Sequence, residues 1–211
     1  MTDRPRIAVV DYGIGNLRSA EKALQHVGAD ARLTSDADEI AAADGVVVPG
    51  VGAFGGCVDA LRAVGLDEQV RALAVAARDS EGVPFLGICV GMQLLYTGSD
   101  ENPDVPGLDV LPGRVVELDE SVKRPQMQWN TLRILDPAHW LWAGLKIDPW
   151  LYFVHTYAAQ VGTSTAAVCD YGGEVAAAAA QGRLVATQFH PEKSGANGLR
   201  ILSNFALACQ R

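Results

Sequence analysis

The chain lacks long apolar stretches and an apolar leader. Its 211 residues contain no run of about 18 apolar residues, the length that a membrane-spanning helix needs. Residues 1–6 are charged and precede a short strand-like run, so the apolar core of a signal peptide is absent. We therefore expect a soluble, cytoplasmic protein that does not bind membranes.

Basic clusters and paired cysteines are also missing. The 25 acidic and 17 basic residues give a formal net charge of -8, and no basic run could follow a phosphate backbone, so we expect no nucleic-acid partner. The four cysteines are widely spaced and form no Cys-x-x-Cys pair. This spacing argues against a disulfide framework and a structural zinc site, and we predict no metal site.

Apolar residues make up 49% of the chain, which is enough for one sizeable core, and we predict one domain over residues 1–211. In the first half, strand-length apolar runs alternate with helical patterns, as in βαβ units of a mainly parallel sheet. The expected strands there are 7–10, 46–48 and 85–88, and the expected helices are 17–27, 35–43 with Ser35 as its cap, and 66–78.

Proline and glycine punctuate the second half, where we expect further strands, some of them antiparallel. The candidates are 115–118, 132–135, 151–157, 166–169 and 184–189, followed by a last helix at 198–209. An alanine run at 176–180 lies between strand candidates and is too short to interpret.

The most informative segment is FLGICVGMQ at residues 85–93. Cys89 lies between Gly87 and Gly91, after an apolar strand and before a helical pattern, which is typical of a nucleophile elbow. Such a turn needs small flanking residues, and the positive end of a following helix would favour a reactive thiolate. The alternative is a buried, inert cysteine at a strand end.

A second segment, QFHPEK at residues 188–193, places His190 two residues before Glu192. In an extended stretch these side chains would point the same way, so Glu192 could orient the imidazole and stabilise its protonated form. The alternative is a solvated loop histidine beside a surface glutamate. His155 is a weaker candidate base.

Two glycine-containing loops follow predicted strands. VVVPGVG at 46–52 could present backbone N–H groups to an oxyanion, or it could be a simple strand-terminating turn. DYGIGNLR at 11–18 resembles part of a dinucleotide fingerprint, but Arg18 stands where the third glycine is needed. We therefore predict no nicotinamide and no other cofactor.

Together, GICVGMQ and the downstream FHPEK resemble the class I, triad-type glutamine amidotransferases. Within that family, PGVG at 49–52, DYGIGN at 11–16 and YFVHTY at 152–157 are similar to the glutaminase subunits of imidazole glycerol phosphate synthase. The resemblance implies a flavodoxin-like α/β fold, with a mainly parallel central sheet, helices on both faces and additional antiparallel strands in the second half.

The resemblance also implies an enzyme that hydrolyses L-glutamine to L-glutamate and ammonia. The ammonia would pass to a (β/α)8-barrel cyclase subunit, in a heterodimer that makes imidazole glycerol phosphate and aminoimidazole carboxamide ribotide for L-histidine biosynthesis. Two alternatives are a paralogous glutaminase that feeds a different barrel synthase and a cysteine hydrolase or chaperone on the same fold. A non-catalytic binding module is disfavoured by the intact Cys, His and Glu set.

Residue by residue, the resemblance implies the following roles: nucleophile Cys89, base and acid His190, orienting residue Glu192; oxyanion-hole backbone Gly50, Val51 and Val90; glutamine contacts Gly52, Gln93, Glu101, Thr156 and Tyr157; partner interface Asn16, Gln128, Trp129 and Tyr152. From the residues alone, Glu101 could equally lie in a solvated turn. One departure stands out, because Gln128 replaces a glycine that is common in the family between a methionine and a tryptophan.

Overall fold

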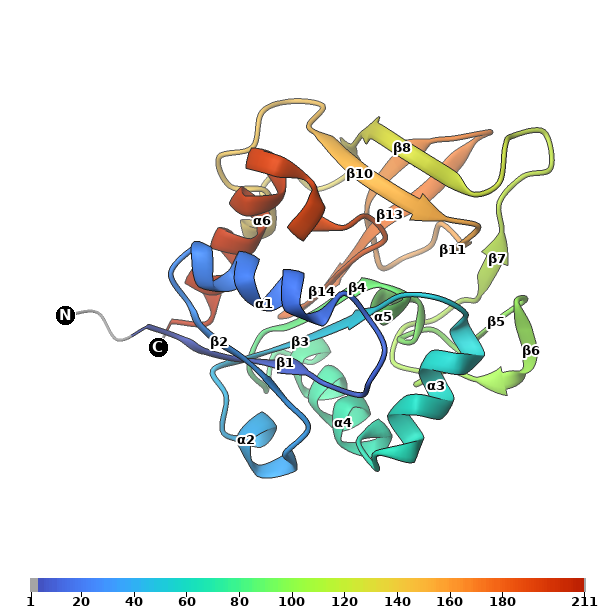
Figure 1. The fold of residues 1–211 in the computed structure, drawn as a ribbon. Coiled ribbons are helices and arrows are strands. Elements are labelled where there is room, and N and C mark those ends of the chain that lie inside the picture. Colours follow the sequence, from blue (N-terminus) through green and yellow to red (C-terminus); the bar gives the residue numbers. More distant parts are fainter. Residues whose placement is uncertain (1–3, 211) are drawn as a thin grey trace.

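The computed structural model describes residues 4–210, which are built around a central eight-stranded sheet (Figure 1). The strand order is β2-β1-β3-β4-β14-β13-β12-β9. The first five of these strands pair in parallel, in the order known from flavodoxin-like folds, whereas the last three are antiparallel. This arrangement confirms the predicted parallel sheet with antiparallel additions from the second half of the chain.

In chain order the elements are β1 Arg6–Val10, α1 Leu17–His26, β2 Asp30–Thr34, α2 Ala37–Ala41, β3 Gly45–Gly50, α3 Phe54–Ala63, α4 Asp67–Arg78, β4 Phe85–Cys89, α5 Val90–Gln93, β5 Gly98–Ser99, β6 Asn102–Pro106, β7 Val115–Glu117, β8 Gln126–Thr131, β9 Arg133–Ile134, the 3-10 turn η1 Trp140–Trp142, β10 Trp150–His155, β11 Tyr157–Ala159, β12 Thr165–Asp170, β13 Glu174–Gln181, β14 Leu184–Thr187, the 3-10 turn η2 Pro191–Lys193 and α6 Gly195–Ala208.

Helices cover both faces of the parallel part of the sheet. In Figure 1, α1 and α6 lie on one side and α3 and α4 on the other. Each helix buries one stripe; α4, for example, buries Val70, Ala74 and Ala77 at the spacing of successive helical turns. The helices thus cover both faces of the parallel strands. The loops at the carboxyl ends of these strands remain accessible and carry the site.

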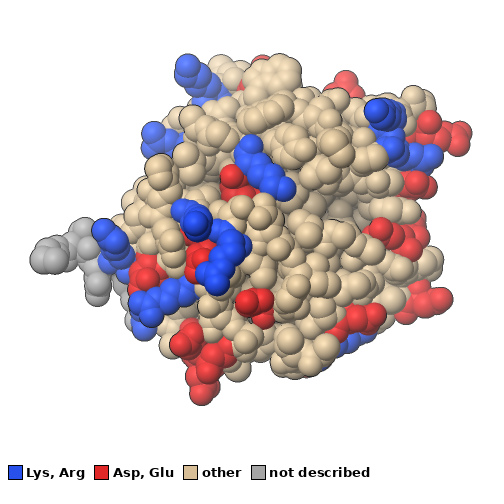
Figure 2. All heavy atoms as spheres, viewed as in Figure 1, with Lys and Arg blue, Asp and Glu red and all other residues tan. Residues whose placement is uncertain are grey.

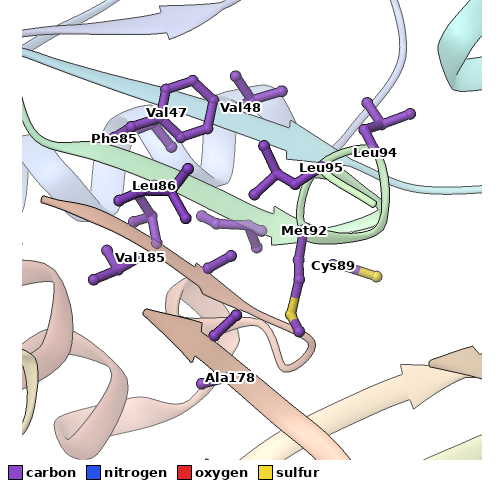
Figure 3. Packing of buried hydrophobic residues seen from close by; sticks show 14 of the residues in the cluster. Val47, Val48, Phe85, Leu86, Cys89, Met92, Leu94, Leu95, Ala178 and Val185 are labelled. Atoms are coloured by element: carbon purple, nitrogen blue, oxygen red, sulfur yellow. The ribbon is translucent and has the colours of Figure 1, made fainter. Parts of the chain in front are cut away.

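The centre of the sheet is apolar on both of its faces. Strands β3 and β4 are buried along their whole length, as expected for parallel strands between two helical layers. Figure 3 shows side chains of these strands, including Val47 and Leu86, packed with Val185 of β14. Burying a side chain of this size contributes about 1.5–3 kcal/mol, so the carboxyl end of β4, where Cys89 stands, is firmly anchored.

Several elements were not predicted from the sequence. β2, α3 and β8 were not identified, and the uninterpreted alanine run is the middle of β13, where Ala176 to Ala179 are fully buried. The cap of the short second helix was placed one residue too early. Asp36, and not Ser35, accepts the backbone N–H groups of Asp38 and Glu39.

Two smaller sheets extend the second half of the chain. β8 and β10 form an antiparallel ladder, and β11, β7, β5 and β6 form a four-stranded sheet. Between residues 4 and 210, no helix is long and apolar enough to cross a membrane. On the face shown in Figure 2, acidic and basic side chains are interspersed and do not form a continuous basic surface.

Candidate active site

Cys89 occupies a strained turn between β4 and α5. Its backbone has φ 55° and ψ -112°, outside the usual regions for a residue with a side chain. A Cβ at Gly91 would collide with the carbonyl oxygen of Val48, and one at Gly87 would lie 2.6 Å from the Gly91 carbonyl oxygen. Both flanking glycines are therefore required by close backbone contacts, which explains the elbow pattern in the sequence.

The helix after the elbow is shorter than the sequence pattern suggested. α5 comprises only Val90–Gln93, so its dipole adds little to the stability of a thiolate. A polar side chain also approaches the sulfur, since Nε2 of Gln188 lies 3.7 Å from the Cys89 sulfur. The side-chain amide of Gln188, and not a long helix, therefore supplies a donor beside the sulfur.

His190 and Glu192 form a buried pair. The Nδ1 atom of His190 lies 2.8 Å from Oε1 of Glu192, and their side chains are 2% and 3% exposed. The expected extended geometry is wrong, because Pro191–Lys193 is a 3-10 turn that curls Glu192 back towards the imidazole. The solvated-loop alternative is wrong as well, since both side chains are buried.

Ser194 fixes the segment that carries this pair. Its hydroxyl donates to the carbonyl oxygen of His190 at 2.6 Å and accepts the backbone N–H of Tyr152 at 3.0 Å. The backbone N–H of His190 in turn donates to the Tyr152 carbonyl oxygen. Strand β10 thus holds the histidine beside the carboxyl end of β4.

The surroundings of His190 favour its charged form. Burial lowers the pKa of the imidazole, but the neighbouring Cys89 sulfur and the Glu192 carboxylate outweigh this and raise the pKa to about 9. The ring is then an imidazolium at neutral pH. Its Nε2 makes no hydrogen bond within residues 4–210 and belongs to a ring that lines the pocket, so a proton is ready for a bound molecule.

One pocket of about 600 Å³ contains most of the predicted site. Among the candidates, its lining includes Cys89, His190, Val51, Val90, Gly52, Gln93, Glu101, Thr156, Tyr157 and Asn16. Gly50 lies opposite Cys89 in the β3–β4 register, and Glu192 lies behind the imidazole. Gln128, Trp129 and Tyr152 lie outside the lining.

Glu101 lies in the turn between β5 and β6, but it is half-buried and its carboxylate binds protein atoms. Its Oε2 accepts the backbone N–H of Phe54 at 2.8 Å, and Oδ1 of Asn102 accepts that of Gly55 at 2.8 Å. The two side chains therefore cap the start of α3, a helix that the sequence pattern did not reveal. With Oε2 occupied, Oε1 is the oxygen of Glu101 that can meet a ligand.

A buried chain of amides was missed by sequence reasoning. Nε2 of Gln93 donates to the carbonyl oxygen of Tyr157 at 2.9 Å and to Oε1 of Gln188 at 3.1 Å, and Gln188 continues to the Cys89 sulfur. The only available signal was the position of Gln188 directly before the FHPEK segment. Its partner lies 95 residues away, which no local pattern encodes.

A residue of α3 forms a hydrogen bond with the loop that follows β3. The Cys57 thiol donates to the carbonyl oxygen of Val51 at 3.3 Å, and burial raises the pKa of this thiol to about 11, so it stays protonated. Gly52 follows with φ 87°, a conformation that favours glycine. The loop is therefore an ordered part of the pocket and more than a strand-terminating turn.

Three of the four interface candidates lie on the β8–β10 ladder and divide between its two faces, whereas Asn16 precedes α1. Trp129 and Tyr152 are opposite each other and their rings meet edge to face, 6.1 Å apart. Gln128 pairs with the buried Phe153 and so belongs to the other face of the ladder. The departure from the family pattern at Gln128 therefore does not alter the face that carries Trp129.

The described part of the chain holds no group of three or more His, Cys, Asp or Glu that could bind a metal ion. All four cysteines are free and buried. The site can thus supply a nucleophilic sulfur, an imidazolium with its carboxylate partner, and backbone donors.

Comparisons with known proteins agree with this chemistry. The family model described as "Glutamine amidotransferase class-I" matches residues 8–209. A relative named imidazole glycerol phosphate synthase subunit HisH, from Methanosarcina mazei, is 44% identical and covers 97% of this chain and 99% of its own length. The HisH subunit of Synechococcus elongatus is 47% identical, with 97% and 94% covered.

Solved structures of lower sequence identity share the fold. A crystal structure described as a putative GMP synthase protein from Thermoplasma acidophilum has a TM-score of 0.70 at 22% identity and covers 99% of this chain and 96% of its own. A second structure, described as a glutamine amidotransferase, has a TM-score of 0.71 at 20% identity, with 96% and 98% covered. Matched by the family model and by the HisH relatives along almost its whole length, the chain belongs to the class-I glutamine amidotransferases and, among them, to the family of the HisH subunits of imidazole glycerol phosphate synthase.

Proposed function

We propose that this chain is a glutaminase subunit that hydrolyses L-glutamine to L-glutamate and ammonia, and that a cyclase subunit uses the ammonia to make imidazole glycerol phosphate. The observation that carries the glutaminase activity is the buried His190–Glu192 pair, 2.8 Å apart, in one pocket with the strained Cys89. The names of the HisH relatives support the wider role in histidine biosynthesis.

The first step uses Cys89 and His190 as a charge pair. Because the pKa of His190 is raised to about 9, the imidazole keeps its proton at neutral pH and stabilises a thiolate. The thiolate attacks the side-chain amide carbon of glutamine, and the carbonyl oxygen becomes an oxyanion. Backbone N–H groups of Val51 and Val90 are the proposed donors, with Gly50 shaping the hole, and one such donor contributes about 2.7–4 kcal/mol.

The second step releases ammonia. The proton on His190 Nε2 passes to the departing nitrogen, the carbon–nitrogen bond breaks and a glutamyl thioester remains on Cys89. Neutral His190 then takes a proton from water, whose oxygen attacks the thioester and releases glutamate. Glu192 stabilises the imidazolium in both steps and is a positioning residue, because it contacts the ring and not the substrate.

Substrate contacts follow from atoms that the protein leaves available. Oε2 of Glu101 and Nε2 of Gln93 are occupied by the protein, so Oε1 of each is the atom that we assign to glutamine N–H groups. Glu101 would pair with the substrate ammonium. Gly52, Thr156 and Tyr157 complete the proposed glutamine site, since all three line the pocket.

The outward face of the β8–β10 ladder is the proposed docking face for the barrel-shaped cyclase subunit. Met127, Trp129 and Trp150 are 63%, 46% and 57% exposed there, and exposed aromatic residues of this kind are enriched at protein interfaces. Tyr152 lies on the same face, and Asn16 lines the pocket. A heterodimer through this face would set the ammonia source beside its consumer.

Partner exchange separates this proposal from a paralogous glutaminase that feeds another synthase. The purified chain is mixed either with the cyclase subunit or with an unrelated barrel synthase, and glutamine-dependent product is measured in each mixture. Product that forms only in the mixture with the cyclase subunit supports the proposal. Product only with another synthase would favour the paralogous function and leave the glutaminase chemistry intact.

A further inference from the structure

His155 ends strand β10 and is buried in the wall of the Cys89 pocket, at 7% exposure. Its Nδ1 lies 2.9 Å from the carbonyl oxygen of Tyr157. Because a carbonyl oxygen can only accept, Nδ1 carries the ring proton and donates it. Burial also lowers the pKa of His155 to about 4, so the ring is neutral at neutral pH. Nε2 is consequently an unprotonated acceptor.

That acceptor has no hydrogen-bond partner within residues 4–210, although it is buried. A buried polar atom without a partner destabilises the fold, so an unpartnered acceptor in a residue that lines a pocket indicates a ligand with an N–H or O–H group. His155 is thus built as a fixed, neutral acceptor. It is unsuited to the role of base that the sequence left open for it.

The position of His155 in the pocket limits which ligand group can reach its Nε2. His155 and His190 line the same pocket, and the positive charge of His190 contributes to lowering the pKa of His155. Pro125 and Val154, which border or belong to the β8–β10 ladder, line the same pocket. Gly52 and Glu101, which we assign to the substrate, come from different segments, the loop after β3 and the turn before β6.

From this arrangement we propose that Nε2 of His155 accepts a hydrogen bond from the departing amide nitrogen of glutamine, and then from the ammonia. This proposal rests on the glutaminase function proposed above. As the carbon–nitrogen bond breaks, His190 gives its proton to the nitrogen, which becomes ammonia with three N–H donors. His155 binds one of these donors.

A neutral acceptor suits this task better than a charged one. A neutral histidine cannot protonate ammonia, so the nitrogen keeps the lone pair with which it reacts in the cyclase subunit. A cationic histidine at the same place would offer N–H groups to N–H groups and repel ammonium. His155 would therefore hold newly formed ammonia in reactive form until it moves to the partner.

The test measures where the nitrogen goes, in the complex with the cyclase subunit. Glutamine labelled with ¹⁵N in its amide is supplied together with excess unlabelled ammonium chloride and the ribotide substrate. The labelled fraction of the imidazole glycerol phosphate then reports direct transfer. His155→Asn keeps a side-chain donor for Tyr157 but has no acceptor at the position of Nε2. His155→Phe also removes it and keeps a ring against Phe153, whose centroid lies 5.9 Å away. His26→Asn, at the exposed end of α1, is the matched control.

We expect the labelled fraction to fall severalfold in both His155 variants, while synthesis at saturating ammonium stays at the wild-type rate. His26→Asn should retain the wild-type fraction. A wild-type fraction in either folded variant would overturn the role of His155. If the wild-type complex makes no labelled product at all, the proposed function itself is wrong. The wild-type measurement alone therefore distinguishes that failure from a failure of the role of His155.

Discussion

The Tyr12 hydroxyl donates a 2.6 Å hydrogen bond to the carbonyl oxygen of Pro49, and the bond is buried. Across the loop, the Cys57 thiol binds the carbonyl oxygen of Val51. The peptide between Gly50 and Val51 therefore lies between two carbonyls that side chains hold in place. Any reorientation of the proposed oxyanion-hole backbone is confined to this peptide.

We predict that Tyr12→Phe lowers the kcat of glutamine hydrolysis with little change in KM. The variant removes a buried hydrogen bond, which contributes about 0.5–1.5 kcal/mol, and loosens the loop that presents the oxyanion donor. Steady-state glutamate release and urea denaturation measure the two effects. Tyr171→Phe is the control, because its hydroxyl also donates at 2.6 Å to a backbone carbonyl, that of Lys123, outside the pocket. Equal kcat values for Tyr12→Phe and the wild type would show that the hydrogen bond from Tyr12 to Pro49 does not support the oxyanion-hole loop.

Cys89→Ala should abolish glutamine hydrolysis, because no other sulfur from the described residues lines the pocket. The complex with the cyclase subunit should still form product from added ammonium salts. Glutamate release and product formation are measured separately. Cys209→Ala removes a buried thiol from the last helix boundary and should keep both activities. Residual glutaminase activity in the Cys89 variant would mean that another group is the nucleophile.

Glu192→Gln should lower kcat and shift the alkaline limb of the pH profile to lower pH. The carboxylate helps to raise the pKa of His190 to about 9, so its neutralisation lowers that pKa and the imidazolium is lost earlier as pH rises. In the wild type, activity should fall as pH rises through about 9. The measurement is kcat against pH at saturating glutamine. A superimposable profile for the variant would remove Glu192 from this role.

Trp129→Ala should weaken binding of the cyclase subunit by about 2 kcal/mol or more, the range of an aromatic hot spot. Isothermal titration calorimetry of the two purified subunits measures the effect. Leu207→Ala is the control, because Leu207 is 57% exposed on α6, away from the ladder. If both variants bind like the wild type, the docking face lies elsewhere.

Glutaminase activity of the isolated chain should be low and should rise when the cyclase partner and its ligand bind. Gly52, at φ 87°, and Gly50 permit the peptide between Gly50 and Val51 to turn its N–H towards or away from the pocket. Gaining one oxyanion donor accounts for about 10²–10³ in rate. Glutamate release with and without partner and ligand measures this stimulation. Identical rates would show a loop that is already organised.

The sequence revealed the elbow because its geometry requires local residues. Only glycine fits at positions 87 and 91, where neighbouring backbone atoms come too close for a Cβ, and so the requirement is visible in the sequence itself. The pairing of His190 with Glu192 was also predicted, but for the wrong reason. Pro191 starts a 3-10 turn, which two-residue alternation cannot foresee.

Long-range features escaped sequence reasoning. The middle of β13 consists of alanines, which carry little strand preference and form a strand because β12 and β14 pair with them. The first N–H groups of helix α3 are capped by Glu101 and Asn102, which lie 47 positions further along the chain. Gln188 was hidden in the same way. The extent of the domain over residues 1–211 and the roles of the site residues stay predictions.

The most direct test is to mix the purified chain with the cyclase subunit and its ribotide substrate, supply glutamine as the sole nitrogen source, and measure glutamate and imidazole glycerol phosphate together. The account predicts that both appear in equal amounts, and that neither appears when Cys89→Ala replaces the wild type. Glutamine left intact by the wild-type mixture, or glutamate formed without imidazole glycerol phosphate, would contradict it.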